Sequence, residues 1–326
     1  MKIFLNYKKI LFFTALIVSF PCKVIISQDD ATWWNETHHW DGITSWTQYI
    51  IHSPYYTGPN ALPVPYSQKG RVKDQVELRM DLEGHFSKGD NTQDVLLDCY
   101  IPLLKNKIAV EFYGIPFEHY NMDEPTVIER RGRNRDGEGY AMGDFYFSTM
   151  VQLIRDKKIP DMTLRMACKT ASGSQLSDAR YTDAPGYFFD LSMGKDILCK
   201  DKIISKIRFH GMIGFYSWQM NLPENRQNDA VLFGAGVDVM FTGFCLNNSL
   251  DGYSGYFGKE LVVVGDKTEP LSFRDRPIVY RLDLMKQTDH FDFGLGYQSG
   301  LNDFIYQSIK LSLVYHFSIK QNDSFH

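Results

Sequence analysis

The feature that most constrains this chain is a strict alternation of side chains over residues 72–87. One parity is polar throughout: Lys73, Gln75, Glu77, Arg79, Asp81, Glu83, His85 and Ser87. The other parity is apolar apart from Asp74. Successive side chains of a β-strand point to opposite faces, whereas a helical period of 3.6 residues would spread these charges around the circumference. The pattern therefore predicts a β-strand much longer than the usual ~5–6 residues.

Similar alternation continues toward the end of the chain. Residues 305–317 divide in the same way, and ten more segments are predicted as strands: 92–103, 106–121, 140–155, 161–172, 186–196, 203–218, 230–246, 252–265, 276–286 and 290–299. The connections between these strands alternate in length. The short ones lie at one end of the predicted barrel, at 105–106, 156–158, 198–201, 247–251 and 286–289. The longer ones lie at the other end, at 122–139, 172–185, 221–229 and 266–275. This asymmetry is typical of membrane barrels with short periplasmic turns. The sequence predicts an all-β fold, a transmembrane antiparallel up-and-down β-barrel of about 12 strands over residues 73–319.

Composition excludes several other classes of protein. Mean hydropathy is −0.29, and no run of ~20 apolar residues follows the N-terminus, so a bundle of membrane-spanning helices is excluded. The 35 Lys and Arg residues nearly balance the 39 Asp and Glu residues, which argues against a nucleic-acid partner. The alternative is a soluble secreted β-sandwich or propeller, but its strands would be shorter, and strands of this kind would expose an apolar face to water.

The N-terminus reads as a secretory signal. Lys2, Lys8 and Lys9 precede an apolar run over residues 10–20, and cleavage after Ser27 would follow. Lipidation of Cys22 is the alternative. We therefore expect a signal peptide at 1–27, a location in the outer membrane of a Gram-negative bacterium, and a short periplasmic tail at 320–326.

Residues 28–72 do not alternate and are rich in aromatic side chains. Aromatic density of this kind is too high for a disordered leader. We expect the segment to fold against the periplasmic mouth or to enter the lumen as a plug. The plug candidates are Trp33, Trp34, Trp40 and Trp46. A short helix at 43–51 on the membrane surface is the alternative.

Parity also assigns the charged side chains to the lumen. The predicted pore-lining residues are Arg79, Asp81, Glu83, Asp98, Glu111, Asp144, Arg165, Lys169, Arg208 and Asp238. Buried charges must pair or stay hydrated, and twelve strands fall between the filled eight-stranded barrels and the open barrels of about 16–18 strands. We expect a narrow passive channel for small solutes, a monomer surrounded by outer-membrane lipid. A plugged structural or interaction barrel of the envelope is the alternative.

The sequence predicts no catalytic residue, cofactor or metal site. His85 with Ser87, and His316 with Ser318, resemble the His-x-Ser pairs of outer-membrane lipid hydrolases. Those enzymes carry the pair on the lipid side, whereas parity turns both pairs toward the lumen here, so a lipid hydrolase is the least favoured function. The adjacent residues His38 and His39 lack a matching second pair of metal ligands. The cysteines are spaced too widely to predict a disulfide framework.

Three short segments resemble outer-membrane barrels of the phenol meta-pathway type, a transporter-like group. They are GDFYFS at 143–148, KTASG at 169–173 and DAPGYFFD at 183–190. The resemblance covers roughly 50 residues and its motifs are weakly specific. It implies diffusion of small molecules, hydrophobic ones among them, through the outer membrane. The tryptophan-rich leader and the high content of Tyr and Phe are similar to barrels of the Bacteroidota.

Overall fold

The computed structural model describes residues 31–199, 203–219, 227–256, 259–261 and 271–317. The chain divides into two units, Met1–Thr32 and Trp33–His326. The first unit is described only at Ala31 and Thr32, so the fold below is that of the second. The signal peptide, the cleavage site and the tail at 320–326 lie outside the described residues and stay predictions.

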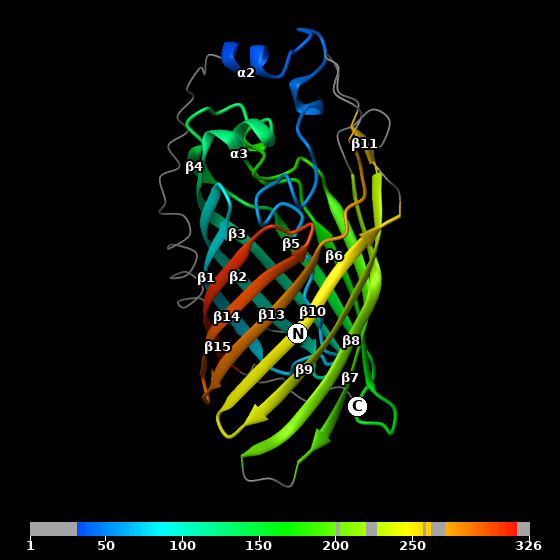
Figure 1. Cartoon of the computed structure of the whole chain (residues 1–326). Coiled ribbons are helices and arrows are strands. Elements are labelled where there is room, and N and C mark those ends of the chain that lie inside the picture. Colours follow the sequence, from blue (N-terminus) through cyan, green and yellow to red (C-terminus); the bar gives the residue numbers. More distant parts are fainter. Residues whose placement is uncertain (1–30, 200–202, 220–226, 257–258, 262–270, 318–326) are drawn as a thin grey trace, which may run out of the picture. The chain divides into compact units, whose positions relative to one another are not determined.

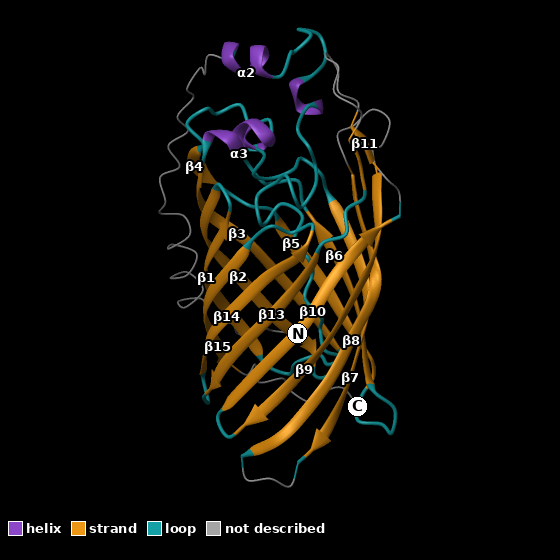
Figure 2. Ribbon diagram, viewed as in Figure 1, coloured by secondary structure: helices purple, strands orange, loops and turns teal. Residues whose placement is uncertain are grey.

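The second unit contains a closed barrel of twelve antiparallel strands, which confirms the predicted fold class (Figure 2). The ring runs in the order β2-β1-β15-β14-β13-β10-β9-β8-β7-β6-β5-β3, and pairing of β3 with β2 closes it. The barrel strands are β1 (Val76–Ser87), β2 (Asp90–Leu104), β3 (Ile108–Met122), β5 (Phe145–Ile154), β6 (Asp161–Lys169), β7 (Gly186–Leu198), β8 (Ile204–Gln219), β9 (Gln227–Phe241), β10 (Phe244–Gly255), β13 (Ile278–Gln287), β14 (Phe291–Asn302) and β15 (Gln307–Phe317).

Three further strands lie outside the ring. The short strand β4 (Glu138–Ala141) pairs with the end of β3, and β11 (Lys259–Leu261) and β12 (Leu271–Phe273) form a separate two-stranded sheet. A short helix, α3 (Glu124–Glu129), follows β3, and the side chain of Asp123 accepts a hydrogen bond from the backbone N–H of Thr126 at its start. These elements lie at the end of the barrel that carries the long connections, which we call the loop end. The opposite end is the turn end.

One region differs from the sequence-based expectation. The predicted strands 230–246 and 252–265 and the turn at 247–251 are wrong, because the chain turns at Thr242 and Gly243. Gly243 has a φ of +80°, a conformation that glycine adopts without steric cost. The asparagines at 247 and 248 favour a turn by propensity, but they lie within β10 and pair with Asp283 and Leu282 of β13. Asn247 shares the lumen face of Asp283, and Asn248 accepts a hydrogen bond from Tyr280, so both polar side chains are accommodated in a strand.

The two faces of the barrel differ as the alternation predicts. Large apolar side chains are exposed on the outside: Met80, Leu82, Phe86, Phe112, Phe147, Phe189, Phe209, Ile213, Leu284, Phe293, Leu295, Ile309 and Leu311. Charged side chains are buried on the inside: Asp81, Asp94, Asp144, Arg165, Lys169, Asp190, Arg208, Asp238, Arg281 and Lys310. An apolar exterior of this extent is stable only against lipid, so the barrel spans a membrane. No helix among the described residues is long and apolar enough to cross a membrane.

The segment before β1 passes through the barrel (Figure 1). It begins with α2 (Thr32–Thr37) and the 3-10 helix η1 (Trp46–Gln48) at the loop end. We call residues 33–56 the cap segment. Residues 57–73, which we call the strap, then descend inside the barrel and join β1 at Val76, where β1 pairs with Phe317 of the last strand.

Candidate functional site

The candidate site is the lumen together with the strap that occupies it. The strap contains Pro59, Pro63 and Pro65, which have no backbone N–H and therefore cannot extend a ladder as a central strand does. Its upper part packs into the largest buried cluster of the barrel, where Leu62 and Val64 are almost fully buried. Most of this cluster consists of aromatic side chains: Tyr146, Phe188, Tyr216, Trp218, Tyr253, Phe304 and Tyr306. The loop end of the lumen is therefore filled.

Below this cluster, three arginines of the barrel wall donate hydrogen bonds to backbone carbonyls of the strap. Arg281 Nη2 lies 2.6 Å from the carbonyl oxygen of Val64. Arg165 Nη2 lies 2.7 Å from that of Tyr66, and Arg208 Nη2 lies 2.8 Å from that of Lys69. The lumen charges thus hold the backbone of the strap.

Each of these arginines also pairs with a carboxylate of the wall. Arg165 Nε lies 2.6 Å from Asp190, directly across from it in the ladder between β6 and β7. Arg281 Nη1 lies 2.8 Å from Asp251, and Arg208 Nη1 lies 2.7 Å from Asp196. A guanidinium carries five N–H donors in a rigid fork and can serve both partners at once.

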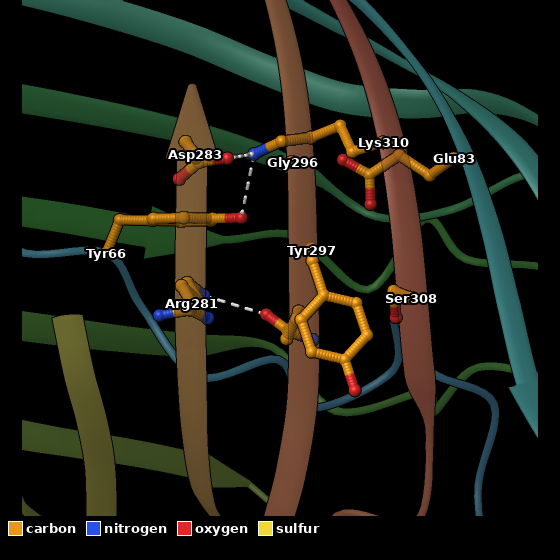
Figure 3. Close-up of a pocket in the computed structure, with 9 residues that line it drawn as sticks. Tyr66, Glu83, Arg281, Asp283, Gly296, Tyr297, Ser308 and Lys310 are labelled. Atoms are coloured by element: carbon orange, nitrogen blue, oxygen red, sulfur yellow. Dashed lines mark hydrogen bonds and ion pairs between the residues drawn. The ribbon is translucent and has the colours of Figure 1, made fainter. Parts of the chain in front are cut away.

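Tyr66 of the strap is 43% exposed and contacts two cations of the barrel wall (Figure 3). The guanidinium carbon of Arg281 lies 3.8 Å from the centre of the Tyr66 ring. On the other side, Lys310 Nζ donates to the phenolic oxygen over 3.3 Å and also pairs with Asp283 at 3.1 Å. The ring therefore lies between two cations, an arrangement that its electron-rich faces favour.

The lower strap is held by ion pairs. Lys69 Nζ lies 3.0 Å from Asp238, which also lies 3.3 Å from His210. The next residue of the strap, Gly70, has a φ of +76°, and a Cβ there would meet the carbonyl oxygen of Asp161 at 2.7 Å. Arg71 then pairs with the side chain of Asp161 at 2.7 Å. A glycine is thus required where the strap passes the start of β6.

A buried ionic network closes the loop end. Arg130 and Arg180 each lie 2.6 Å from Asp90, and Arg180 also lies 2.9 Å from Glu118. Burial opposes the charged form of Arg180, but Glu118 and Asp90 raise the pKa of this guanidinium well above its ordinary value. Asn60 of the strap donates to Glu118 over 3.1 Å. The network thus joins the loops, the wall and the strap.

A cavity of about 770 Å³ remains beside the strap. Its lining extends from exposed residues of the turn end, such as Asp74 and Thr288, to buried Tyr181 near the ionic network. Eight predicted pore-lining residues lie on its surface: Arg79, Asp81, Glu83, Asp98, Glu111, Asp144, Arg165 and Asp238. The other two are buried in ion pairs, Lys169 with Asp144 at 2.5 Å and Arg208 with Asp161 at 3.0 Å.

The four tryptophans proposed as a plug lie in the cap segment at the loop end. Trp34 donates from its indole nitrogen to the carbonyl oxygen of Arg131 over 2.8 Å, and Arg133 lies over the ring of Trp46 at 4.8 Å. The residues inside the lumen are those of the strap. Tyr66 is the member of the site that sequence reasoning missed, because it lies in a segment without periodicity.

The pair of His85 and Ser87 is arranged differently from a hydrolase pair, and Ser318 of the other pair lies outside the described residues. His85 hydrogen-bonds with Ser308, at 2.7 Å between Nδ1 and Oγ, and with Asp94, rather than with Ser87. His316 Nε2 lies 2.9 Å from Asp292. Both histidines belong to the inner wall and line the cavity. The partners of His85 follow from pairing of the first strand with the last, which parity alone does not specify.

No protein-family model matches the chain, and no curated protein matches it. Among solved structures, the chain is similar to an outer-membrane channel from Pseudomonas putida F1, with 8% identity and a TM-score of 0.49 over 78% of this chain and 100% of that one. It is also similar to the KdgM porin in complex with disordered oligogalacturonate, with 8% identity and a TM-score of 0.41 over 73% of this chain and 99% of that one. The transport unit of the autotransporter AIDA-I from Escherichia coli gives 9% identity and a TM-score of 0.41 over 79% of this chain and 94% of that one.

At these identities each likeness concerns architecture alone. The class of protein follows from the chain's own geometry. Closure of all twelve strands, an apolar outer face and a charged inner face define an outer-membrane β-barrel. The likeness to phenol meta-pathway barrels and to the Bacteroidota stays a prediction.

Proposed function

We propose that the barrel is a channel for small polar solutes and that the strap closes it in the state described. The observation that carries this proposal is the double pairing of the lumen arginines. Arg165, Arg208 and Arg281 each hold a strap carbonyl and a wall carboxylate. If the strap moves aside, every one of them keeps an ionic partner, so these three arginines stay paired without the strap.

The cost of moving the strap lies in the strap's own contacts, which include the ion pairs of Lys69 with Asp238 and of Arg71 with Asp161. Burial of Leu62 and Val64 stabilises the closed state by roughly 1.5–3 kcal/mol for each side chain. The cation–π contacts of the Tyr66 ring, which is 43% exposed, add about 0.5–1 kcal/mol. These magnitudes support a strap that can be displaced while the barrel stays folded.

The lining of the cavity supports polar rather than hydrophobic solutes. Both carboxylates and guanidinium groups line it, among them Asp98, Glu111 and Arg79. Charged groups in a passage must stay hydrated or paired, so a solute that can replace water is favoured. A volume of about 770 Å³ falls within the range of sites that hold small organic molecules.

Single-channel recording in planar bilayers tests this function. The full-length protein should show low conductance with rare openings, and deletion of residues 33–71 should give a large, stable conductance. Folding of the deletion variant is checked by its heat-dependent mobility in gels. A folded variant that conducts no better than the intact protein contradicts the strap as a closure.

A structural or interaction barrel is the second candidate, and the network of Asp90, Glu118, Arg130 and Arg180 favours it. These groups are buried at the loop end, and their pairs do not depend on the strap. If this network alone seals the lumen, neither the intact protein nor the deletion variant will conduct ions or take up solutes.

A further inference from the structure

Three potential metal ligands meet on the inner wall where β1 faces β2. Glu83 and His85 are two residues apart on β1 and therefore share a face, and Asp94 lies directly across from Glu83 in the ladder. One ligand atom from each residue lies within 4.8 Å of the other two. His85 Nε2 is 2.8 Å from Asp94 Oδ2 and 3.5 Å from Glu83 Oε2. Two carboxylates thus converge on a single ring nitrogen.

Lys310 lies directly across from Glu83 in the ladder with β15, but it lies on the side of β1 away from Asp94, so the convergence favours a further positive centre between the carboxylates. Like charges placed directly across a strand pair destabilise a sheet, and Glu83 and Asp94 are such a pair. Metal–ligand bonds to histidine and carboxylate measure about 2.0–2.2 Å, so two ligands of one ion lie roughly 3–3.5 Å apart. The separations around His85 Nε2 already match this spacing with small adjustments of side-chain torsions.

Two further observations point to a ligand. His85 Nδ1 is engaged by Ser308 Oγ at 2.7 Å, which leaves Nε2 to face the carboxylates. Metal-binding histidines are held by a hydrogen bond at their other nitrogen in this way. Asp94 is fully buried through its side chain, yet its Oδ1 has no hydrogen-bond partner among the residues that the structure describes. A buried carboxylate oxygen without a partner is costly unless a ligand satisfies it.

We propose that Glu83, His85 and Asp94 form a binding site for a divalent transition-metal ion, Zn²⁺ in the first instance. One imidazole and two carboxylates are a ligand set that suits Zn²⁺. An ion reaches the site from the lumen, because Glu83 and His85 line the main cavity. The site is independent of transport and would exist in a barrel that never opens.

The site also contacts the strap. Asn60 Nδ2 donates to Asp94 Oδ2 over 2.6 Å. A metal ion bound through Asp94 would therefore fix the carboxylate that holds the upper strap. The ion is expected to stabilise the closed arrangement.

The chain offers a matched control in His316. This histidine also lies on the inner wall between two carboxylates, with Asp292 at 2.9 Å from Nε2 and Glu77 at 3.6 Å from Nδ1. Because the carboxylates are on opposite ring nitrogens, they do not gather around one point with the imidazole. The His316 cluster has the same composition without the geometry of a site.

Zinc binding by the purified, folded barrel without a histidine tag tests the proposal. The chelator-treated protein is titrated with Zn²⁺, and bound metal is counted by mass spectrometry after dialysis. We expect an equimolar amount of zinc, with affinity lowered at least about tenfold in His85→Asn and unchanged in His316→Asn. Ser308→Ala, which keeps all three ligands, should lower the affinity by about 10–100-fold and serves if His85→Asn does not fold.

X-ray absorption of the zinc-loaded protein supplies a second readout. It should show one imidazole and oxygen ligands, and the imidazole contribution should disappear in His85→Asn. Zinc binding that is equal in His85→Asn and the unaltered protein overturns the proposal, as does an equal loss in His316→Asn. Absence of zinc from the unaltered protein assigns the positive centre to a proton instead.

Discussion

The guanidinium of Arg281 covers the ring of Tyr66 and at the same time donates to the carbonyl oxygen of Val64, two residues earlier in the strap. A single wall side chain thus fixes both the backbone and a side chain of the segment that fills the lumen. This relationship makes Tyr66 the residue whose loss should most directly weaken closure of the channel.

Tyr66→Ala is expected to raise the open fraction of single channels by about two- to fivefold, because the Tyr66 side chain is 43% exposed and an exposed cation–π contact contributes about 0.5–1 kcal/mol. Tyr66→Phe should have a smaller effect, since it loses only the hydrogen bond from Lys310. Tyr55→Ala is the control, because Tyr55 lies in the cap segment and is 41% exposed. Equal currents from Tyr66→Ala and Tyr55→Ala would count against a role of this contact in closure.

Gly70→Ala should displace the lower strap without unfolding the barrel. A Cβ at this position would lie 2.7 Å from both the carbonyl oxygen of Asp161 and the amide nitrogen of Gly194. Gly42→Ala provides a matched control, because Gly42 has a similar φ of +73° with nothing within 4 Å of the added Cβ. Limited proteolysis should cut the strap faster in Gly70→Ala alone. Similar cleavage in both variants would assign the effect to backbone conformation.

Arg180→Leu should lower the free energy of unfolding by about 3–5 kcal/mol, because it leaves Asp90 and Glu118 with less compensation in a buried site. Arg135→Ala is the control. Arg135 pairs with Glu124 at the same end of the barrel, but both side chains are more than half exposed, and such pairs contribute about 0–1 kcal/mol. Urea unfolding followed by tryptophan fluorescence measures both. A loss below about 1 kcal/mol in Arg180→Leu would contradict the structural role of the network.

The cap segment should loosen on acidification. Burial, followed by the charges of Arg131 and His39, lowers the pKa of His38 from 6.5 to about 4. The unfolded segment therefore binds a proton more readily than the folded one, so stability is fully present above pH 6.5 and falls as the pH drops from 6.5 toward 4. Iodide quenching of tryptophan fluorescence should increase in this window. The same increase in His38→Gln would exclude His38 as the cause.

The cap segment should be accessible from outside the cell. Short turns of outer-membrane barrels face the periplasm, so the loop end and the exposed Ile43 face outward. In a background without native cysteines, Ile43→Cys should react with a membrane-impermeant maleimide on intact cells. Thr242→Cys, in a turn between β9 and β10, should react only after lysis. Labelling of Thr242→Cys on intact cells would reverse the orientation.

The barrel could be predicted because the alternation of polar and apolar side chains is visible within each strand by itself. Alternation over residues 72–87 requires one face in lipid and one in the lumen, and Met80 and Asp81 take these places. Prediction was less successful at β9 and β10, where asparagines inside a strand resembled a turn. Turn propensity is outweighed there by ladder pairing of Asn247 with Asp283.

The strap and the metal ligands could not be predicted with the same means. Residues 57–73 have no period, and their place depends on contacts with Arg165, Arg208 and Arg281 from three distant strands. Ser308 meets His85 only because β15 returns to pair with β1. Such contacts depend on closure of the ring, and the residue pattern within either strand does not indicate which strands pair to close it.

A segment that runs lengthwise through a ring of strands also constrains the order in which the barrel assembles. The strap is covalently joined to β1 at the turn end and is continuous with the cap segment at the loop end, so it cannot enter the ring sideways once β1 has paired with β15. Either the strap is in place before the last strand seals the seam, or the cap segment is later drawn lengthwise through the finished lumen. The first order needs no such passage, so we expect an ordered assembly in which the strands close around the strap.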